Sequence, residues 1–216
     1  MTDLPTVVCY GDSNTWGAIG ATHERHPRDV RWPGVVAALL TGRAHVVEEG
    51  LSGRTTVWED PFCAGRNGRT YLLPCLASHA PVAVLVIMLG TNDLKAVLRL
   101  GPAEIAAGAG SLVDLARDGG SGPGGGPPAV LLVAPPPLGE VTVAAELWGF
   151  GAAHAASTRL APLYREAARQ SGAAFLDAGA LVATDAADGV HLDGAAHGVL
   201  GRAIATAVAE LLGAAG

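Results

Sequence analysis

Two polar stretches contain the side-chain types that enzymes use for nucleophilic acyl transfer. Ser13 follows an apolar run in VVCYGDSNTWG (residues 7–17), and Asp188 and His191 stand three residues apart in DGVH. A serine becomes a nucleophile when a base lies within hydrogen-bond reach and a carboxylate orients that base. A spacing of three residues can place both side chains on one side of a turn or a first helical turn. These residues predict that Ser13 is the nucleophile, His191 its base and Asp188 the residue that orients His191.

Acyl transfer also needs hydrogen-bond donors for the negative charge that develops on the carbonyl oxygen. Three groups could supply them: the backbone N–H of Ser13, the backbone N–H of Gly53 in LSGRTT, and the side-chain amide of Asn92 in LGTND. Gly53 suits this role because a residue without a Cβ lets its N–H approach a substrate oxygen closely. We therefore expect Ser13, Gly53 and Asn92 to form an oxyanion hole.

Each of these stretches also has a purely structural interpretation. A serine after Gly-Asp at a strand end is most often a helix N-cap or a turn residue, and Asn92 with Asp93 could cap a helix in the same way. Asp188 and His191 could form a solvated turn or half of a metal site, although no second histidine or carboxylate stands at ligand spacing. The other six histidines show no pairing pattern and are interpreted as surface or core residues: His23, His26, His45, His79, His154 and His197.

The elements that would position these residues alternate between strands and helices. Five runs rich in Val, Leu and Ile are typical of parallel strands buried on both faces, at residues 6–11, 44–50, 83–90, 129–135 and 173–178. Helical patterns lie at roughly 33–41, 70–79, 102–117, 153–171 and 195–213. This alternation predicts a doubly wound parallel sheet, which binds ligands outside the carboxyl ends of its strands. The polar stretches follow predicted strands, so we expect them to meet at that edge.

Composition and charge restrict the function classes. The chain has 216 residues, 50% of them apolar, and we expect one domain spanning residues 1–216, with the Gly- and Pro-rich stretch 119–128 as a loop. The formal charge of −6 argues against nucleic-acid binding, and no basic run favours a membrane surface. The three cysteines lack the spacing of a disulfide framework or a zinc site. No secretory signal or membrane-spanning run is recognised, so a cytoplasmic protein is expected.

Four motifs, GDSNTWG, GLSGRTT, LGTND and DGVHLD, resemble in order and spacing the signature blocks of the SGNH (GDSL-type) hydrolases. The segments DVRWPGVVAALL, VVEEGLSGRTT, LVIMLGTNDLK and VLLVAPPPL are most similar to the bacterial arylesterase, acyltransferase and perhydrolase group. The resemblance implies a flavodoxin-like three-layer α/β/α sandwich with a five-stranded parallel sheet. It also implies an acyl-enzyme mechanism without metal or cofactor, with Ser13, His191 and Asp188 as the triad and Ser13, Gly53 and Asn92 as the oxyanion-hole donors.

The chain departs from the family after the nucleophile, where Leu is usual and Asn14 stands here. A polar amide there would alter the acyl pocket, and Trp16 and Phe150 are expected either to line a narrow apolar entrance or to pack in the core. The resemblance implies a small ester as substrate and water, an alcohol or hydrogen peroxide as acyl acceptor. It also favours a homo-oligomer, for which the C-terminal helix and residues 138–156 are candidate interfaces, and the alternative for both segments is packing within the chain. The alternatives are a carbohydrate O-deacetylase with the same triad and a flavodoxin-like protein that binds an anion or nucleotide.

Overall fold

The centre of the computed structural model is a sheet of five parallel strands in the order β2-β1-β3-β4-β5. The structure describes residues 4–20, 22 and 24–214, so His23 lies outside the described part of the chain. The strands nearly coincide with the expected ranges and are β1 (Thr6–Gly11), β2 (His45–Gly50), β3 (Val82–Met88), β4 (Ala129–Ala134) and β5 (Ala174–Asp177).

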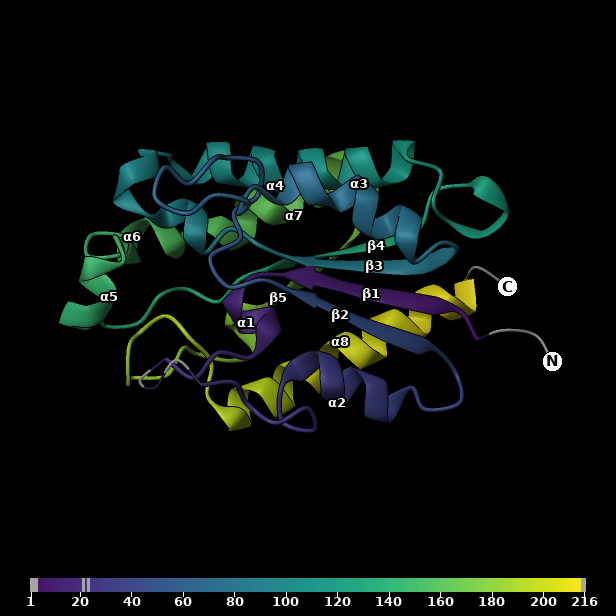
Figure 1. Ribbon diagram of the computed structural model, residues 1–216, viewed down its shortest axis with the longest axis horizontal. Helices are drawn as coiled ribbons and strands as arrows, with labels where there is room; N and C mark the ends of the chain where they lie inside the picture. The colour runs from purple at the N-terminus through teal and green to yellow at the C-terminus, as the bar shows by residue number, and fades with distance from the viewer. Residues whose placement is uncertain (1–3, 21, 23, 215–216) are drawn as a thin grey trace.

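Helices cover both faces of the sheet (Figure 1). One face carries α3 (Gly68–Ser78), α4 (Pro102–Asp118) and α7 (Leu160–Gln170), and the other carries α2 (Trp32–Leu39) and α8 (Gly194–Ala214). Successive side chains of a strand point to opposite faces. Val8 and Tyr10 of β1 therefore join the apolar cluster beneath α4, whereas Val7 and Cys9 join the cluster beneath α8. The apolar residues of β1 therefore contribute to a core on each face of the sheet. The predicted three-layer sandwich is confirmed.

The helical pattern at 153–171 differs from the expectation, because it is divided into α6 (His154–Ser157) and α7. Ser157 Oγ donates to His154 O at 2.6 Å and accepts the Leu138 N–H at 2.9 Å. A side chain engaged in this way competes with helix continuation, and the chain turns at residues 158–159. The remaining elements are short: α1 (Ser13–Trp16), η1 (Asn92–Leu94), η2 (Ala96–Leu98), η3 (Pro123–Gly125), α5 (Val143–Leu147) and η4 (Ala178–Ala180).

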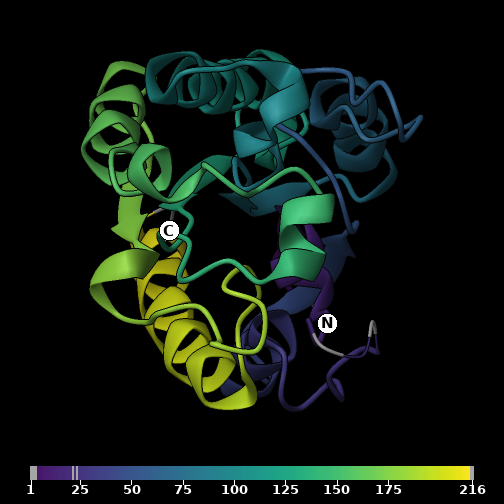
Figure 2. The ribbon, with the colours of Figure 1, turned by 90° about the vertical axis from the view of Figure 1, so that its left-hand side faces the viewer.

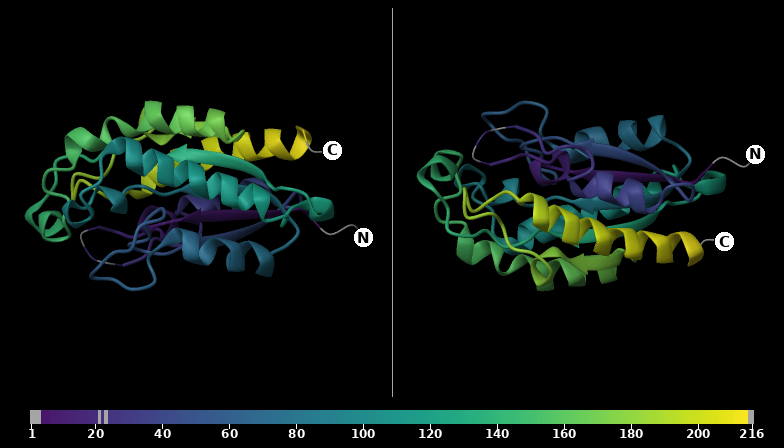
Figure 3. Two further views of the ribbon diagram at one scale, coloured as in Figure 1. Left: turned by 90° about the horizontal axis from the view of Figure 1, so that it is seen from above. Right: turned by 90° about the horizontal axis from the view of Figure 1, so that it is seen from below.

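The C-terminal helix α8 runs along α2 on one face of the sheet (Figure 3). It is the one helix among the described residues long and apolar enough to cross a membrane, with a mean hydropathy of 1.2, although a core helix of a soluble protein meets the same criteria. Leu200, Ile204 and Val208 are buried under the sheet. A Cβ on Gly201 would lie 2.7 Å from Val35 Cβ, so this glycine permits the close approach of the two helices.

His197 on α8 is a core residue. Its Nδ1 accepts the Trp32 N–H at 3.3 Å, its ring meets His26 edge-on at 5.1 Å, and its Nε2 has no partner among the described residues. Burial, with the neighbouring His26 as a second cause, lowers the pKa of His197 from 6.5 to about 3. The folded protein therefore holds this imidazole neutral at pH values where the unfolded chain protonates it.

The protein should become less stable as the pH decreases, because of His197. A group whose pKa is lowered by folding contributes stability that is complete above its unfolded value and is lost as pH falls towards its folded value, here from 6.5 to about 3. Between about pH 7 and about pH 5, we expect the free energy of urea unfolding of the wild type to drop by about 2 kcal/mol more than that of His197→Leu. The exposed His45→Leu serves as control, and equal pH dependence of wild type and His197→Leu would contradict the assignment.

Candidate active site

The carboxyl ends of the strands bring the expected residues to one edge of the sheet, and Figure 2 looks onto that end of the molecule. β1 ends at Gly11, Asp12 caps α1, and Ser13 is the first residue of that short helix. Asp12 Oδ1 accepts the Asn14 N–H at 2.9 Å. Gly17 then ends the helix in the left-handed conformation, with a φ of 89° that favours glycine. A capped turn therefore fixes Ser13 at the strand end.

Ser13, His191 and Asp188 form a continuous chain of polar contacts, although Ser13 and His191 are 178 residues apart in sequence. Ser13 Oγ lies 3.0 Å from His191 Nε2, and Asp188 Oδ2 lies 2.5 Å from His191 Nδ1. Asp188 Oδ1 accepts the N–H groups of Val190 at 2.8 Å and His191 at 2.9 Å. An ionised Asp188 selects the tautomer with the proton on Nδ1, which leaves Nε2 free to accept the Ser13 proton.

The charge of Asp188 is maintained by its hydrogen bonds. Burial raises the pKa of this carboxyl, but the hydrogen bonds from the His191 side chain and from the backbone of His191 and Val190 outweigh burial and hold the pKa below its usual range. The Asp188 side chain is only 3% exposed. A Cβ on Gly20 would lie 1.7 Å from Asp188 Oδ2, so only glycine allows the chain to pack there. The arrangement presents an ionised, shielded carboxylate to His191.

Asn14, which was expected to alter the acyl pocket, does not line the cavity beside Ser13. It is only 1% exposed. Its Nδ2 donates to Val190 O at 3.2 Å, and its Oδ1 accepts the Leu192 N–H at 3.0 Å. These two backbone groups flank His191, so the Asn14 amide ties the nucleophile helix to the loop that carries the base. This bridge needs one donor and one acceptor on the same side chain, which Leu lacks.

Replacing Asn14 should affect turnover rather than substrate binding. We expect Asn14→Leu to lower kcat about tenfold to a hundredfold. The His191 loop loses its two hydrogen bonds to Asn14, and the imidazole therefore shifts relative to Ser13. KM should change little, since Asn14 does not line the cavity. Steady-state kinetics on a nitrophenyl ester measures both constants, with Gln170→Leu, an exposed amide on α7 outside the cavity, as control. A raised KM with unchanged kcat would instead place Asn14 against the substrate.

The three groups expected in the oxyanion hole line the same cavity: Ser13, Gly53 and Asn92. Within the described residues, the backbone N–H groups of Ser13 and Gly53 make no hydrogen bond. Asn92 Nδ2 donates one hydrogen to Arg54 O at 3.1 Å, and its second hydrogen remains for a ligand. Gly53 has a φ of 82°, a left-handed conformation that favours glycine. Each of the three therefore offers an N–H to a bound molecule.

The cavity beside Ser13 has a volume of about 490 Å³ and a predominantly apolar wall, which suits a small-molecule site. Trp16 and Phe150 line it. Trp148 also lines it and stands edge-on to His191, with ring centroids 6.0 Å apart. The sequence had pointed to Phe150 but not to Trp148 as a pocket residue, although both aromatics lie in the segment 138–156. Further lining residues that it missed include Ile19, Ser52, Cys63, Arg66 and Lys95.

A buried carboxylate behind the oxyanion hole holds two loops together. Asp93 accepts the backbone N–H of Thr56 at 3.0 Å and also its hydroxyl. Burial raises the pKa of Asp93 to about 6, with the hydrogen bonds from Thr56 opposing that rise. Asp93 thereby anchors the strand-end segment that carries Asn92 to the one that follows Gly53.

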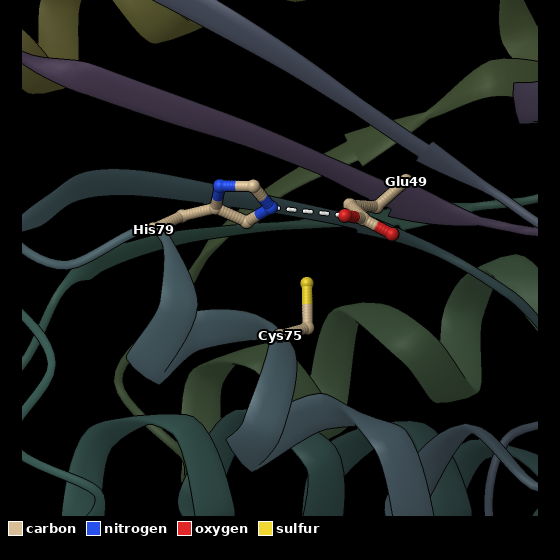
Figure 4. A group of neighbouring side chains, drawn as sticks. All are labelled: Glu49, Cys75 and His79. Carbon is tan, nitrogen blue, oxygen red and sulfur yellow. Dashed lines mark hydrogen bonds and ion pairs between the residues drawn. The ribbon is translucent and has the colours of Figure 1, made fainter.

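Among the described residues, Glu49, Cys75 and His79 form the group whose ligand atoms lie close enough to hold a metal ion, all within 4.8 Å of one another (Figure 4). His79, which showed no partner in the sequence, lies with Nε2 2.9 Å from Glu49 Oε1. Burial, assisted by Glu49, raises the pKa of Cys75 to about 12, and the Arg54 guanidinium acts on the same thiol. In the metal-free protein the Cys75 thiol is therefore neutral and lies beside the hydrogen-bonded side chains of His79 and Glu49.

Comparison with known proteins shows the family to which the chain belongs. Residues 9–199 match the model of the GDSL-like Lipase/Acylhydrolase family. A carbohydrate acetylesterase from Sinorhizobium meliloti is 43% identical, with a TM-score of 0.90 over 96% of this chain and 99% of that one. An aryl esterase from M. smegmatis is 41% identical, with a TM-score of 0.91 over 96% and 99% of the two chains. A search of curated proteins found no match. The chain therefore belongs to the GDSL-like lipase/acylhydrolase (SGNH) family and is an esterase/acylhydrolase of the Ser–His–Asp type.

Proposed function

We propose that this protein cleaves small carboxylic esters through an acyl-enzyme on Ser13. Ser13 Oγ attacks the ester carbonyl while His191 Nε2 takes its proton, and the N–H groups of Ser13, Gly53 and Asn92 stabilise the oxyanion. The tetrahedral intermediate then breaks its bond to the alcohol, which leaves with the proton from His191. The observation that carries this proposal is the contact of 3.0 Å between Ser13 Oγ and His191 Nε2 at the cavity wall, with Asp188 behind the imidazole.

The acyl group is then transferred to water, an alcohol or hydrogen peroxide, each of which gives its proton to His191. The aromatic wall of Trp16, Trp148 and Phe150 favours acceptors with apolar parts over water. To test this, a nitrophenyl ester is hydrolysed with increasing butanol or peroxide, and the free acid, butyl ester and peracid are quantified. We expect the acid fraction to fall as the acceptor concentration rises. Acid as the sole product under all conditions would limit the enzyme to hydrolysis.

Deacetylation of carbohydrates is a second candidate function. It is favoured by the similarity to carbohydrate acetylesterases from Sinorhizobium meliloti, which are 43% and 38% identical to this chain. The same triad would remove an acetyl group from a sugar hydroxyl. The two functions are distinguished by comparing kcat/KM for an aryl acetate with kcat/KM for an acetylated oligosaccharide, corrected for the reactivity of the leaving group. A higher corrected value for the oligosaccharide would make deacetylation the main activity.

Removing the Asn92 amide should slow the chemical step. We expect Asn92→Ala to lower kcat roughly 10²–10³-fold, because one donor to the oxyanion is lost. KM should be affected less, since the charge on the carbonyl oxygen develops only in the transition state. Steady-state kinetics with a nitrophenyl ester measures this effect, and circular dichroism verifies the fold. Turnover near the wild-type level would remove Asn92 from the oxyanion hole.

We also infer that the chain self-associates through the rim of the cavity. Val143 and Leu147 on α5 are 74% and 85% exposed, and Phe62 is 82% exposed. Apolar side chains of this size favour a covered surface. The segment that carries Val143 and Leu147 also supplies Trp148 and Phe150 to the cavity wall, so a partner subunit there would narrow the entrance. Sedimentation velocity of the full chain measures the association, and a monomer at micromolar concentration would contradict it.

A further inference from the structure

The cavity beside Ser13 carries a positive charge in a protein whose formal net charge is −6. Its lining contains two permanent cations, Arg66 and Lys95, and no aspartate or glutamate. Lys95 is neutralised, because its Nζ lies 2.9 Å from Asp60 Oδ2 and the Asp60 side chain is only 3% exposed. Arg66 makes no ion pair within the part of the chain that the structure describes. Among the residues that line the cavity, Arg66 is therefore the permanent cation that no ion pair of the described chain balances, and the ionised Asp188 lies behind His191 rather than in the lining.

The position of Arg66 is fixed by its backbone. Arg66 O accepts the Thr55 N–H at 2.9 Å, and the Thr55 hydroxyl lies 3.1 Å from Arg66 O and 2.6 Å from Trp58 O. Thr55 is fully buried, so its backbone bond anchors the start of the Arg66 side chain to the core. The following residue, Asn67, caps α3 with its side chain and holds the chain on the other side. The loop therefore presents the Arg66 side chain to the cavity from a fixed starting point.

The Arg66 side chain lies against Gly53, on the side of this glycine where a Cβ would stand. A Cβ placed on Gly53 would lie 3.4 Å from Arg66 Nε and 3.5 Å from its Cδ. Gly53 supplies one of the proposed oxyanion donors, so the guanidinium stands beside the place where an ester carbonyl would bind. A guanidinium offers five N–H donors in a planar arrangement that matches a carboxylate. In a partly enclosed, apolar cavity such an interaction is stronger than in water.

We propose that Arg66 forms a carboxylate-binding subsite and that the enzyme prefers esters that carry a carboxylate over their uncharged counterparts. This proposal rests on the proposed esterase function of Ser13. The carboxylate can belong to the acyl part or to the alcohol part of the ester. Arg66 recognises the same chemical group in both cases, and the two sources are separated by the choice of substrate.

The test compares two pairs of esters, each a carboxylate and its methyl ester, and the comparison between enzyme variants cancels the difference in intrinsic reactivity within each pair. The first pair is 4-acetoxybenzoate and its methyl ester, which carry the variable group on the alcohol part. The second pair is 4-nitrophenyl hydrogen adipate and 4-nitrophenyl methyl adipate, which carry it on the acyl part. The quantity measured is the ratio of kcat/KM for the anionic ester to kcat/KM for the neutral ester. It is determined for the wild type, Arg66→Gln, Arg66→Lys and Arg69→Gln.

We expect Arg66→Gln to lower this ratio about tenfold to a hundredfold in one of the two pairs, because a hydrogen-bonded charge pair is lost. The pair that responds shows which part of the ester carries the carboxylate. Arg66→Lys should retain part of the preference, since it keeps the charge but not the planar donors. Added salt should lower the wild-type ratio by screening.

Arg69→Gln is the matched control, because Arg69 is exposed on α3 outside the cavity and its loss changes the net charge equally. The inference is overturned if Arg66→Gln leaves both ratios unchanged, or if Arg69→Gln lowers them as much. If the enzyme hydrolyses the neutral esters but substitution of Arg66 leaves the ratios unchanged, only the proposed carboxylate subsite is rejected and the esterase proposal stands. Failure of the wild type to hydrolyse any of the four esters would overturn the esterase proposal together with this one.

Discussion

The Ser13→Ala variant should lose nearly all activity towards short nitrophenyl esters while remaining folded. We expect kcat to fall on the order of 10⁴–10⁶-fold, because the triad acts as a unit and a methyl group cannot form the acyl-enzyme. The fold should be retained, since within the described chain the Ser13 hydroxyl bonds only to the His191 ring, and the turn is held by the Asp12 cap and the Asn14 amide. Nitrophenol release gives the rate, and circular dichroism gives the folded state.

Covalent labelling separates the loss of a nucleophile from a general loss of activity. An organophosphonate that reacts with activated serines should add its mass to the wild-type peptide that contains Ser13 and to no other peptide. Ser111→Ala is the control, because Ser111 Oγ donates only to Gly108 O within α4. If Ser13→Ala were as active as the wild type, or if the label were found on another residue, Ser13 would not be the nucleophile.

The second large effect is expected for Asp188→Asn, with a loss of about 10⁴-fold in kcat. The asparagine oxygen can still accept the backbone N–H groups that Asp188 Oδ1 accepts from Val190 and His191, so the loop should keep its shape. The amide NH₂ would then face His191 Nδ1 and favour the tautomer with the proton on Nε2. In that tautomer the imidazole donates towards Ser13 and cannot take its proton.

Asp185→Asn is a matched control in the same loop, because its carboxylate accepts only the Ala187 N–H and does not meet His191. The pH profile adds a second readout. The pKa of Asp188 is lowered, so this carboxylate stays ionised as pH falls, and its protonation does not account for a loss of wild-type activity at mildly acidic pH. Equal kcat for Asp188→Asn and Asp185→Asn would show that Asp188 does not orient the base.

Much of the fold could be predicted because its strands are specified locally. The run at residues 6–11 is apolar on both faces, as a central parallel strand requires, and β1 indeed fills both cores through Val7 and Val8. The break between α6 and α7 could not be predicted in this way. It accompanies the hydrogen bond between Ser157 and Leu138, which are 19 residues apart and meet only in the folded chain.

The sequence alone determined the chemistry that the site can perform and the edge of the sheet where it lies. Asp188 and His191 could be paired from the sequence because they stand three positions apart, and the strand-end position of Ser13 predicted that it lies at the same edge. Only the tertiary structure decided the roles of Asn14 and Arg66. Asn14 bonds to Val190 and Leu192 far along the chain, and Arg66 lies against Gly53 on a loop held by Thr55. Residue type and local spacing carry no information on such contacts, because the packing of distant segments fixes them.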